Sequence, residues 1–569
     1  MGRASWLAGF CVAIAVAVAP SVVRAQQVRG TILDSTSRLP VPGAVVTLID
    51  ADGNLIARRL ADERGRYAIS FDPRATRLRV VRIGFRPRDV PFTQFPHGLG
   101  AADVGMLAIP TMLEPARVAA RQCPKRSDSE RALGLWEQAR AGLLAAVVAN
   151  ESNPAAMVRL GYRRAMLTTR ANAPITRQIV TLDSAARTTN SYVAARRASD
   201  FVDLGFSEVA DGVRWLYAPD AGVLLEDGFG NGYCMRLAPR NRSRPGDAGL
   251  AFAPADRKKG RVDIVGTLWI DTVARALRDI EYRYIGTDPD VDDFRPGGTI
   301  SFREVPNGSV IIDRWDIRSI DNQMAAIMGT NWGSAPGDYY ATTSGGEVAH
   351  ARWPDGSRYD GSLANLVIAA RSYAGAPASG YTVKLADTPY SETLGESGEF
   401  TVNDLLPGPY AVVVLDTRLA RIGYELTTGF QFTAKRDSTH VFTVPLPTLE
   451  EWTVRRCASD RQYVVGDSVL IVARVVDASG APRTGAEWHA LAEVPVDSTS
   501  VRWAPLARQG WTGSDGIIAL CTGTLQPNQR LKFTVRESRG PLTEFVETIT
   551  GNMTVIPIRL PRLPYRPRP

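Results

Sequence analysis

Short segments of alternating apolar and polar residues, separated by glycine and proline turns, dominate three stretches of the chain. Such alternation is typical of half-buried strands. Tight turns are indicated at Asp52-Gly53 and Arg64-Gly65, where glycine is free of the steric penalty that a Cβ atom brings. The same order of strands and turns returns twice further along the chain. The pattern predicts three β-sandwich domains, at residues 26–113, 366–447 and 457–561.

Each predicted sandwich closes on a strand that contains proline. These prolines are Pro110, Pro445 and Pro557. Proline has no backbone N–H to donate to a central strand ladder. The three closing strands are therefore expected at the edges of their sheets.

Residues 114–350 have a different pattern and are predicted to form a separate domain. Helical spacing runs over residues 127–149, with Ser127 or Ser129 as the cap, Glu130 in the first turn, and an apolar stripe of Ala132, Trp136, Ala139, Leu143 and Val147. Long alternating strands follow, for example at residues 213–217, 262–271, 277–284, 299–303 and 309–315. One helix followed by many antiparallel strands predicts a curved sheet wrapped over the helix.

The turns of the sandwiches carry short motifs in a fixed order. The first sandwich has Pro42-Gly43-Ala44 before a strand and then Asp62-x-x-Gly65-x-Tyr67, and the second has Leu405-x-Pro407-Gly408-x-Tyr410. These residues resemble the carboxypeptidase regulatory-like domain, a small prealbumin-like β-sandwich. The resemblance implies a module that is added to secreted peptidases and outer-membrane receptors. The third sandwich lacks tyrosine after Gly516, so it is either regulatory-like or a bacterial immunoglobulin-like sandwich.

The expected fold class is therefore mainly β and multi-domain, with prealbumin/immunoglobulin-like β-sandwiches flanking an α+β middle domain of helix plus antiparallel sheet. The pattern of the middle domain is similar to the half-barrels of periplasmic lipoprotein carriers. Two interpretations follow from that similarity. A groove between helix and sheet holds an apolar ligand, or helix and sheet simply bury each other.

Composition narrows the class of protein. The chain has 569 residues, 44% hydrophobic and 22% charged, which is typical of globular domains and excludes a disordered or collagen-like chain. The net charge of +8 is spread over the whole length and does not indicate a nucleic-acid partner. Arginines gather locally in the first sandwich, where they form a basic edge for an anionic polymer or protect a sheet edge from aggregation: Arg38, Arg58, Arg59, Arg64 and Arg66.

Residues 1–25 are expected to be a signal peptide. Arg3 precedes an apolar run at residues 6–19, and Val23-Arg24-Ala25 precedes the expected cleavage before Gln26. The run is shorter than the roughly 20 residues that span a bilayer, so the mature chain is predicted to have no transmembrane span. The protein is expected to be exported: periplasmic, outer-membrane-associated or secreted. The proline- and arginine-rich tail at residues 562–569 is expected to lie extended.

Four cysteines remain after that cleavage: Cys123, Cys234, Cys457 and Cys521. An even number in an exported protein predicts disulfides, and four cysteines allow three connectivities. We favour Cys123–Cys234 and Cys457–Cys521, because each pair then lies inside one predicted domain.

The sequence contains none of the common motifs of catalysis or metal binding that the fold class could carry. None of His97, His350, His440 and His489 belongs to a His-x-x-Glu pair, and neither a Gly-x-Ser-x-Gly nucleophile turn nor a phosphate-binding glycine loop is present in the sequence. The acidic run at residues 288–293 lacks the glycine and glutamate of a calcium loop, which favours a solvated loop. No catalytic residue, metal or cofactor is therefore predicted.

The sequence favours an exported, non-catalytic binding or scaffolding protein of the cell envelope. Its β-sandwich modules would engage a glycan, a peptide or an envelope protein. One alternative is a periplasmic carrier or sensor that holds an apolar ligand in the middle domain. A third hypothesis is a hydrolase with a site that no motif reveals. The sequence leaves the oligomeric state open.

Overall fold

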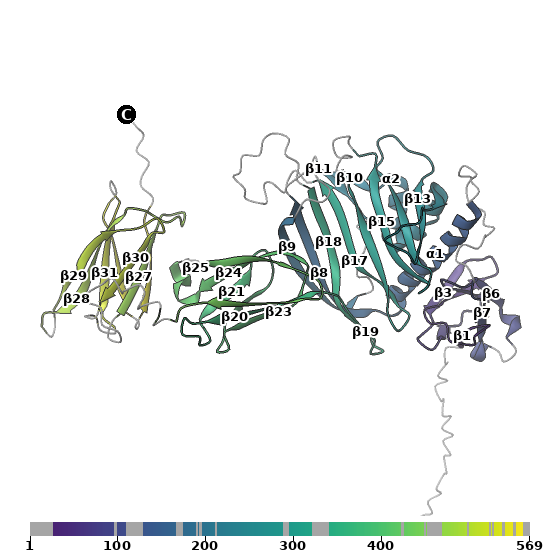
Figure 1. The fold of residues 1–569 in the computed structure, drawn as a ribbon, viewed down its shortest axis with the longest axis horizontal. Coiled ribbons are helices and arrows are strands. Elements are labelled where there is room, and N and C mark those ends of the chain that lie inside the picture. The colour runs from purple at the N-terminus through teal and green to yellow at the C-terminus, as the bar shows by residue number, and fades with distance from the viewer. Residues whose placement is uncertain are drawn as a thin grey trace, which may run out of the picture.

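The computed structural model describes residues 27–561 with interruptions. The residues left undescribed are 1–26, 96–98, 110–128, 167–174, 189–191, 193–195, 211–212, 288–294, 321–340, 423–425, 449–450, 452–468, 498–499, 523–524, 526–527, 538–540, 550–552 and 562–569. The signal peptide, the acidic run at residues 288–293 and the C-terminal tail therefore lie outside the described residues. A large sheet occupies the middle of the molecule, with one sandwich at one end and two in succession at the other (Figure 1).

The three sandwiches share one strand order. Each has a three-stranded sheet, β4-β1-β7, β23-β20-β26 or β30-β27-β33, facing a four-stranded sheet, β3-β2-β5-β6, β22-β21-β24-β25 or β29-β28-β31-β32. In each, the first strand pairs antiparallel with the fourth and parallel with the last. The mainly β fold class is thus confirmed, and the third sandwich repeats the strand order of the first.

The strands of the first sandwich are β1 (Gln27–Asp34), β2 (Val45–Asp50), β3 (Leu55–Leu60), β4 (Arg66–Ser70), β5 (Ala75–Val81), β6 (Arg88–Pro91) and β7 (Val104–Met106), with the short 3-10 helices η1 (Phe92–Gln94) and η2 (Leu99–Ala101). Those of the second are β20 (Ala364–Arg371), β21 (Tyr381–Leu385), β22 (Ser391–Thr393), β23 (Glu399–Leu405), β24 (Gly408–Asp416), β25 (Leu426–Ala434) and β26 (Thr439–Pro445), with η3 (Thr417–Ile422) after β24. Those of the third are β27 (Val469–Val476), β28 (Glu487–Pro495), β29 (Val501–Trp511), β30 (Ile517–Thr522), β31 (Arg530–Arg536), β32 (Thr543–Thr548) and β33 (Met553–Arg559).

Two local predictions about the sandwiches are confirmed. Pro445 and Pro557 lie on β26 and β33, which are both edge strands of their sheets. Pro110 lies outside the described residues. Gly53 and Gly65 have φ angles of 95° and 70°, a conformation that residues with a Cβ atom rarely adopt.

The middle unit is one antiparallel sheet with helices packed on one face. The strand order is β12-β13-β14-β15-β16-β17-β18-β8-β9, with β19 paired to β18. The middle domain was predicted to end at residue 350, but its sheet extends further, since β18 continues to Arg352. Its elements are α1 (Ser129–Ser152), β8 (Ala155–Met166), β9 (Ile175–Thr188), α2 (Ala198–Leu204), the separate hairpin β10 (Ser207–Ala210) and β11 (Val213–Leu216), α3 (Ala221–Leu225), α4 (Asp227–Gly232), β12 (Tyr233–Leu237), β13 (Asp247–Pro254), β14 (Asp263–Asp271), β15 (Ala276–Ile285), β16 (Gly297–Glu304), β17 (Val310–Ile320), β18 (Ala341–Arg352) and β19 (Arg358–Asp360).

Helix α1 is buried on more than one side. Ala132, Trp136, Ala139 and Leu143 of its predicted stripe are buried and Val147 is partly buried, and residues outside the stripe are buried as well: Leu135, Ala141, Ala145, Ala146 and Val148. The reason is that the helix lies between the large sheet and the first sandwich, contacting β12, β15 and β17 on one side and β2 and β3 on the other. One core therefore includes helix, sheet and the sandwich residues Val45 and Ile83. Within that core, helix and sheet bury each other.

The first sandwich is fixed to the middle unit by close backbone approach and by buried polar bonds. Gly43 and Gly308 meet so closely that a Cβ atom on Gly308 would lie 2.5 Å from the Gly43 nitrogen. The Gly84 N–H donates to Gln138 Oε1 of α1 at 2.7 Å, and Arg82 pairs with Glu304 at 2.7 Å.

The proposed basic edge of the first sandwich needs a correction at one position. Arg58 on β3 forms an ion pair with Glu151 of α1 at 2.6 Å, so it contributes to the contact with the helix and is not an open site for an anionic polymer. Arg66 pairs with Asp62 inside the sandwich, at 2.9 Å.

The second sandwich is joined to the opposite end of the sheet, on the face away from α1. Leu160, Tyr162 and Val180 of the sheet belong to the core of that sandwich. Polar bonds surround this apolar contact. Arg177 forms two bonds to Asp387, each 2.7 Å long, and Arg164 donates to the carbonyl of Pro407 at 2.7 Å. The Pro-Gly-x-Tyr turn of the second sandwich therefore contacts the sheet.

Candidate functional site

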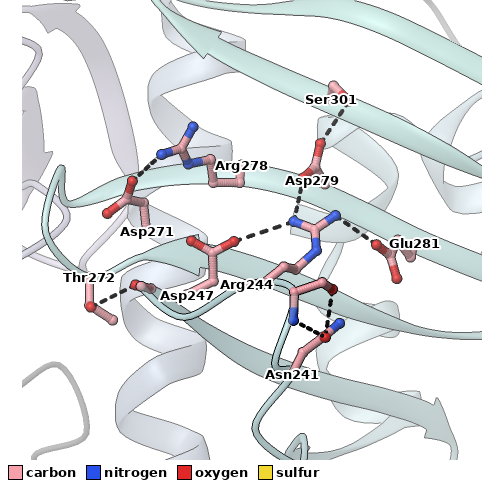
Figure 2. Close-up of polar contacts among 11 residues, drawn as sticks. Asn241, Arg244, Asp247, Asp271, Thr272, Arg278, Asp279, Glu281 and Ser301 are labelled. Atoms are coloured by element: carbon pink, nitrogen blue, oxygen red, sulfur yellow. Dashed lines mark hydrogen bonds and ion pairs between the residues drawn. The ribbon is translucent and has the colours of Figure 1, made fainter.

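The face of the large sheet away from α1 is polar in its middle. On β15, Ile280, Tyr282 and Tyr284 belong to the core shared with α1. Side chains alternate across a strand, so Asp279 and Glu281 lie on the opposite face. Figure 2 views that face, with a helix behind the sheet.

Strand register brings the polar residues into two rows across the sheet. One row runs from Asp279 through Ser301 and Arg314 to Glu347. The other runs from Glu281 through Thr299 and Asp316 to Gly345 and Tyr162. A Cβ atom at Gly345 would lie 2.7 Å from the Tyr162 hydroxyl, so glycine leaves the room that this ring occupies.

A polar cavity of about 420 Å³ lies over these two rows and reaches the second sandwich. Four arginines and four carboxylates line it: Arg164, Arg244, Arg314, Arg436, Asp279, Glu281, Asp316 and Glu347. The formal charges of the lining balance. Thr299, Ser301 and Tyr162 add hydroxyl groups.

Arg244 holds one side of the cavity together (Figure 2). Its guanidinium donates to Asp279 and to Glu281, each at 2.7 Å, and to Asp247 at 3.3 Å. Ser301 Oγ donates to the other oxygen of Asp279 at 2.7 Å. The arginine also lies over the Trp269 ring, 5.2 Å from its centroid. A single planar cation thus fixes carboxylates from two strands.

The opposite side is formed by β8 and β18 of the sheet and by Arg436 of the second sandwich. Arg436 donates through both terminal nitrogens to the buried carboxylate of Glu347, and also to the carbonyl of Ser362 at 2.9 Å. Arg164 lies over the Tyr162 ring, 3.9 Å from its centroid, and donates to Gln178 at 2.6 Å. Most of the charged lining is therefore already paired and held in place.

Arg314 and Asp316 are different from the rest of the lining. Within the described residues, the side chain of Arg314 makes no hydrogen bond or ion pair, and Asp316 accepts only from the backbone N–H of Thr299; both side chains point to the polar face. Burial raises the pKa of Asp316 to about 6, against the lowering effect of Arg318, the Thr299 N–H, Arg164 and Arg314. Among the described residues, the cavity thus presents one unpaired cation, Arg314, and one acid that no cation pairs with, Asp316.

The residues singled out from the sequence lie elsewhere. Cys234 is on β12 and Cys521 on β30, while Cys123 and Cys457 lie outside the described residues, so the disulfide pairing stays a prediction. His350 contacts Asp360 at 2.8 Å and Asp404 at 2.7 Å, at the junction of sheet and second sandwich. In the part of the chain that is described, no three His, Cys, Asp or Glu side chains are grouped to hold a metal ion.

None of the described helices is both long enough and apolar enough to cross a membrane.

The polar cavity itself was missed from the sequence. Its signal is visible in β15 as Asp279 and Glu281 between apolar residues, which shows that the strand has a polar face. Which residues of the neighbouring strands lie opposite them depends on strand register.

Comparison with known proteins identifies the class of the first sandwich. Residues 27–98 match the family model of the carboxypeptidase regulatory-like domain, as the turn motifs indicated. The chain thus contains a domain of this class near its N-terminus. No curated protein matches the chain in sequence.

Solved structures give only distant likenesses. The TIE protein of Bacillus anthracis is 9% identical over 62% of this chain and 63% of its own, with a TM-score of 0.15, so the chain spans less than two thirds of that protein. The minor pilin GBS52 of Streptococcus agalactiae is 15% identical over 36% of this chain and 98% of its own, with a TM-score of 0.13. The shaft pilin SpaA of Lactobacillus rhamnosus GG is 10% identical over 36% and 99%, with a TM-score of 0.14. Scores this low do not establish a common fold.

Proposed function

We propose that the protein is an exported, non-catalytic binding protein of the cell envelope, and that its middle sheet and second sandwich together hold a glycan. The observation that carries the proposal is the charge-balanced polar cavity between these two units. The site therefore belongs to the sheet and only in part to a sandwich, whereas the sequence had suggested sandwich edges and loops.

A sugar suits the chemistry of the cavity. Each sugar hydroxyl both donates and accepts hydrogen bonds, and the cavity offers donors and acceptors side by side. Because Arg244 and Arg436 are already paired with carboxylates, the lining keeps its shape without a ligand, which reduces the entropic cost of binding. Arg314 and Asp316 would then bond to the ligand directly.

A binding assay tests the proposal. The mature chain would be screened on an array of glycans and short peptides, and the best ligands would be measured by calorimetry. We expect glycans to bind and the double variant R314M/D316N to weaken binding at least tenfold. The matched control is Arg283→Met, an exposed arginine on β15 that does not line the cavity, and it should leave binding unchanged.

Three outcomes count against the proposal. If peptides bind and glycans do not, the ligand class is wrong. If nothing binds above an unrelated sandwich domain, the binding function is wrong. Turnover of a peptide or ester library by the purified chain would contradict the non-catalytic assignment.

A second candidate function rests on a different cavity. About 280 Å³ lies between α2, α4 and the β13–β14 loop, lined by Phe201, Phe206 and Phe229 and bordered by Lys258. An apolar ligand would fit these rings, as expected for a periplasmic carrier or sensor. Native mass spectrometry of the purified protein would show retained lipid in that case, and its absence would remove the candidate.

A further inference from the structure

A second, basic cavity of about 650 Å³ borders the polar one and shares Arg244 with it. Its rim is formed by the loop that joins β12 to β13 and by the turn that joins β14 to β15. The apolar residues Ile109, Leu237 and Pro245 form part of its lining.

In the described part of the chain, three arginines of this cavity form no ion pair with a carboxylate. Arg240 and Arg242 are exposed on the loop, and Arg275 lies on the turn; within the described residues none of the three forms an ion pair. By contrast, Arg244 is compensated by three carboxylates. The uncompensated charge of the cavity is therefore positive.

The carboxylates near these arginines are already engaged. Asp247 bonds to Arg244, and Asp271 accepts from Arg278 and from two backbone N–H groups. Asp34 of the first sandwich faces Arg275 but accepts from the backbone N–H of Thr36 at 2.7 Å and of Ser37 at 3.2 Å. Among the described side chains, Asp34 attracts Arg275 without forming an ion pair with it, and no carboxylate pairs with Arg240 or Arg242.

The two segments that carry the arginines are held in fixed positions. Thr272 on the turn donates to the carbonyl of Gly246 on the loop, through its hydroxyl at 2.8 Å and its N–H at 3.0 Å. Arg275 has a φ of 54°, uncommon for a residue other than glycine, and lies over the Phe85 ring, 5.4 Å from its centroid. Asn241 accepts from the N–H and the hydroxyl of Ser243, which orders the loop (Figure 2).

We propose that this basic cavity binds an acidic oligosaccharide, a sugar chain that bears carboxylate, sulfate or phosphate groups. Arginine forms paired hydrogen bonds to each of these groups. A volume of about 650 Å³ exceeds what a single small anion fills, and the apolar part of the lining suits the faces of sugar rings. The inference that the ligand is a sugar rests on the proposed function, whereas the inference that its anionic groups bind here rests on the arginines alone.

Calorimetry on the full mature chain with four probes separates recognition of the sugar from recognition of the anionic groups. The probes are an oligogalacturonate tetramer with carboxylates, a heparin tetrasaccharide with sulfates, neutral maltotetraose, and pyrophosphate. We expect at least one of the two acidic tetramers to bind at least tenfold more tightly than maltotetraose and pyrophosphate. The double variant R240A/R242A should weaken that binding at least tenfold.

The control variant R257A/K259A removes the same charge from another exposed basic loop, between β13 and β14, and should change affinity less than twofold. If both double variants lose the same affinity for the acidic tetramers, the binding depends on the net charge of the protein and the inference is overturned. Pyrophosphate binding as tightly as the tetramers would also overturn it, because the site would then recognise the anion alone. If neutral glycans bind in the array but neither acidic tetramer is preferred, the proposed function stands and this inference fails.

Discussion

Arg244 is predicted to stabilise the polar face more than any exposed arginine on the same sheet. Replacing it with methionine keeps much of its length and removes the charge. Two charge-assisted bonds of 2.7 Å, to Asp279 and Glu281, are lost. At the low end of about 1.5 kcal/mol for each such bond, because the groups are partly exposed, the loss is about 3 kcal/mol. The longer contact to Asp247 adds little.

A loss of that size would be visible in thermal unfolding. For a unit of this size, 1 kcal/mol shifts Tm by about 2–4 °C, so R244M should lower the melting temperature by about 6–12 °C. Hydrogen exchange should accelerate in β13 to β16 first. R283M removes the same charge from an exposed position on β15 and is the control. If both variants melt within 1 °C of each other, the bonds of Arg244 to Asp279 and Glu281 do not stabilise the fold.

The remaining predictions concern the junctions and the cysteines. Partial burial lowers the pKa of His350, but its bonds to two aspartates raise it more, so the net pKa lies above 6.5. The stabilisation of the fold by the protonated imidazole is complete below about pH 6.5 and disappears as pH rises through the raised pKa. The Tm of the wild type should therefore exceed that of H350Q by more at pH 6 than at pH 8.5, and an equal difference at both pH values would contradict this. Gly308→Ala should lower the free energy of unfolding by about 2 kcal/mol or more, because the left-handed backbone is strained and the added Cβ atom collides with Gly43. Gly356→Ala is the control, since Gly356 has a φ of 90° and nothing within 4 Å, so calorimetry of that variant should show the backbone strain alone. Peptide mapping without reductant should recover the two predicted disulfides, each within one domain, and cross-domain pairs would refute the pairing.

Local sequence features predicted the small-scale structure well. The turn glycines Gly53 and Gly65 have the positive φ expected of them, because a tight turn is determined by a few neighbouring residues. The helix was expected at residues 127–149 and is found at Ser129–Ser152. Its stripe was predicted, but burial on the other side was not, because that side is covered by a sandwich some 80 residues earlier in the chain.

Long-range pairing was beyond the reach of the pattern. Strands β8 and β9 follow the helix directly, yet β8 pairs with β18, which is nearly 200 residues away. The polar cavity depends on such pairing, since Asp279, Ser301, Arg314 and Glu347 come from four strands. Alternation within one strand reveals a polar face, whereas the row across strands is determined by register and is not encoded in any single segment.

The position of α1 between the first sandwich and the sheet changes what a deletion experiment can mean. The face of Gly142 lies so close to Ile83 that an added Cβ atom would be 2.6 Å from its Cδ1 atom, and Ile83 is only 2% exposed. Cutting the chain after residue 113 would open this joint and leave apolar helix surface in water. A truncated protein that aggregates or loses binding would then report damage to a shared core. The modules that look separable along the sequence share one core at this end of the molecule, so point substitutions are the appropriate tools to dissect it.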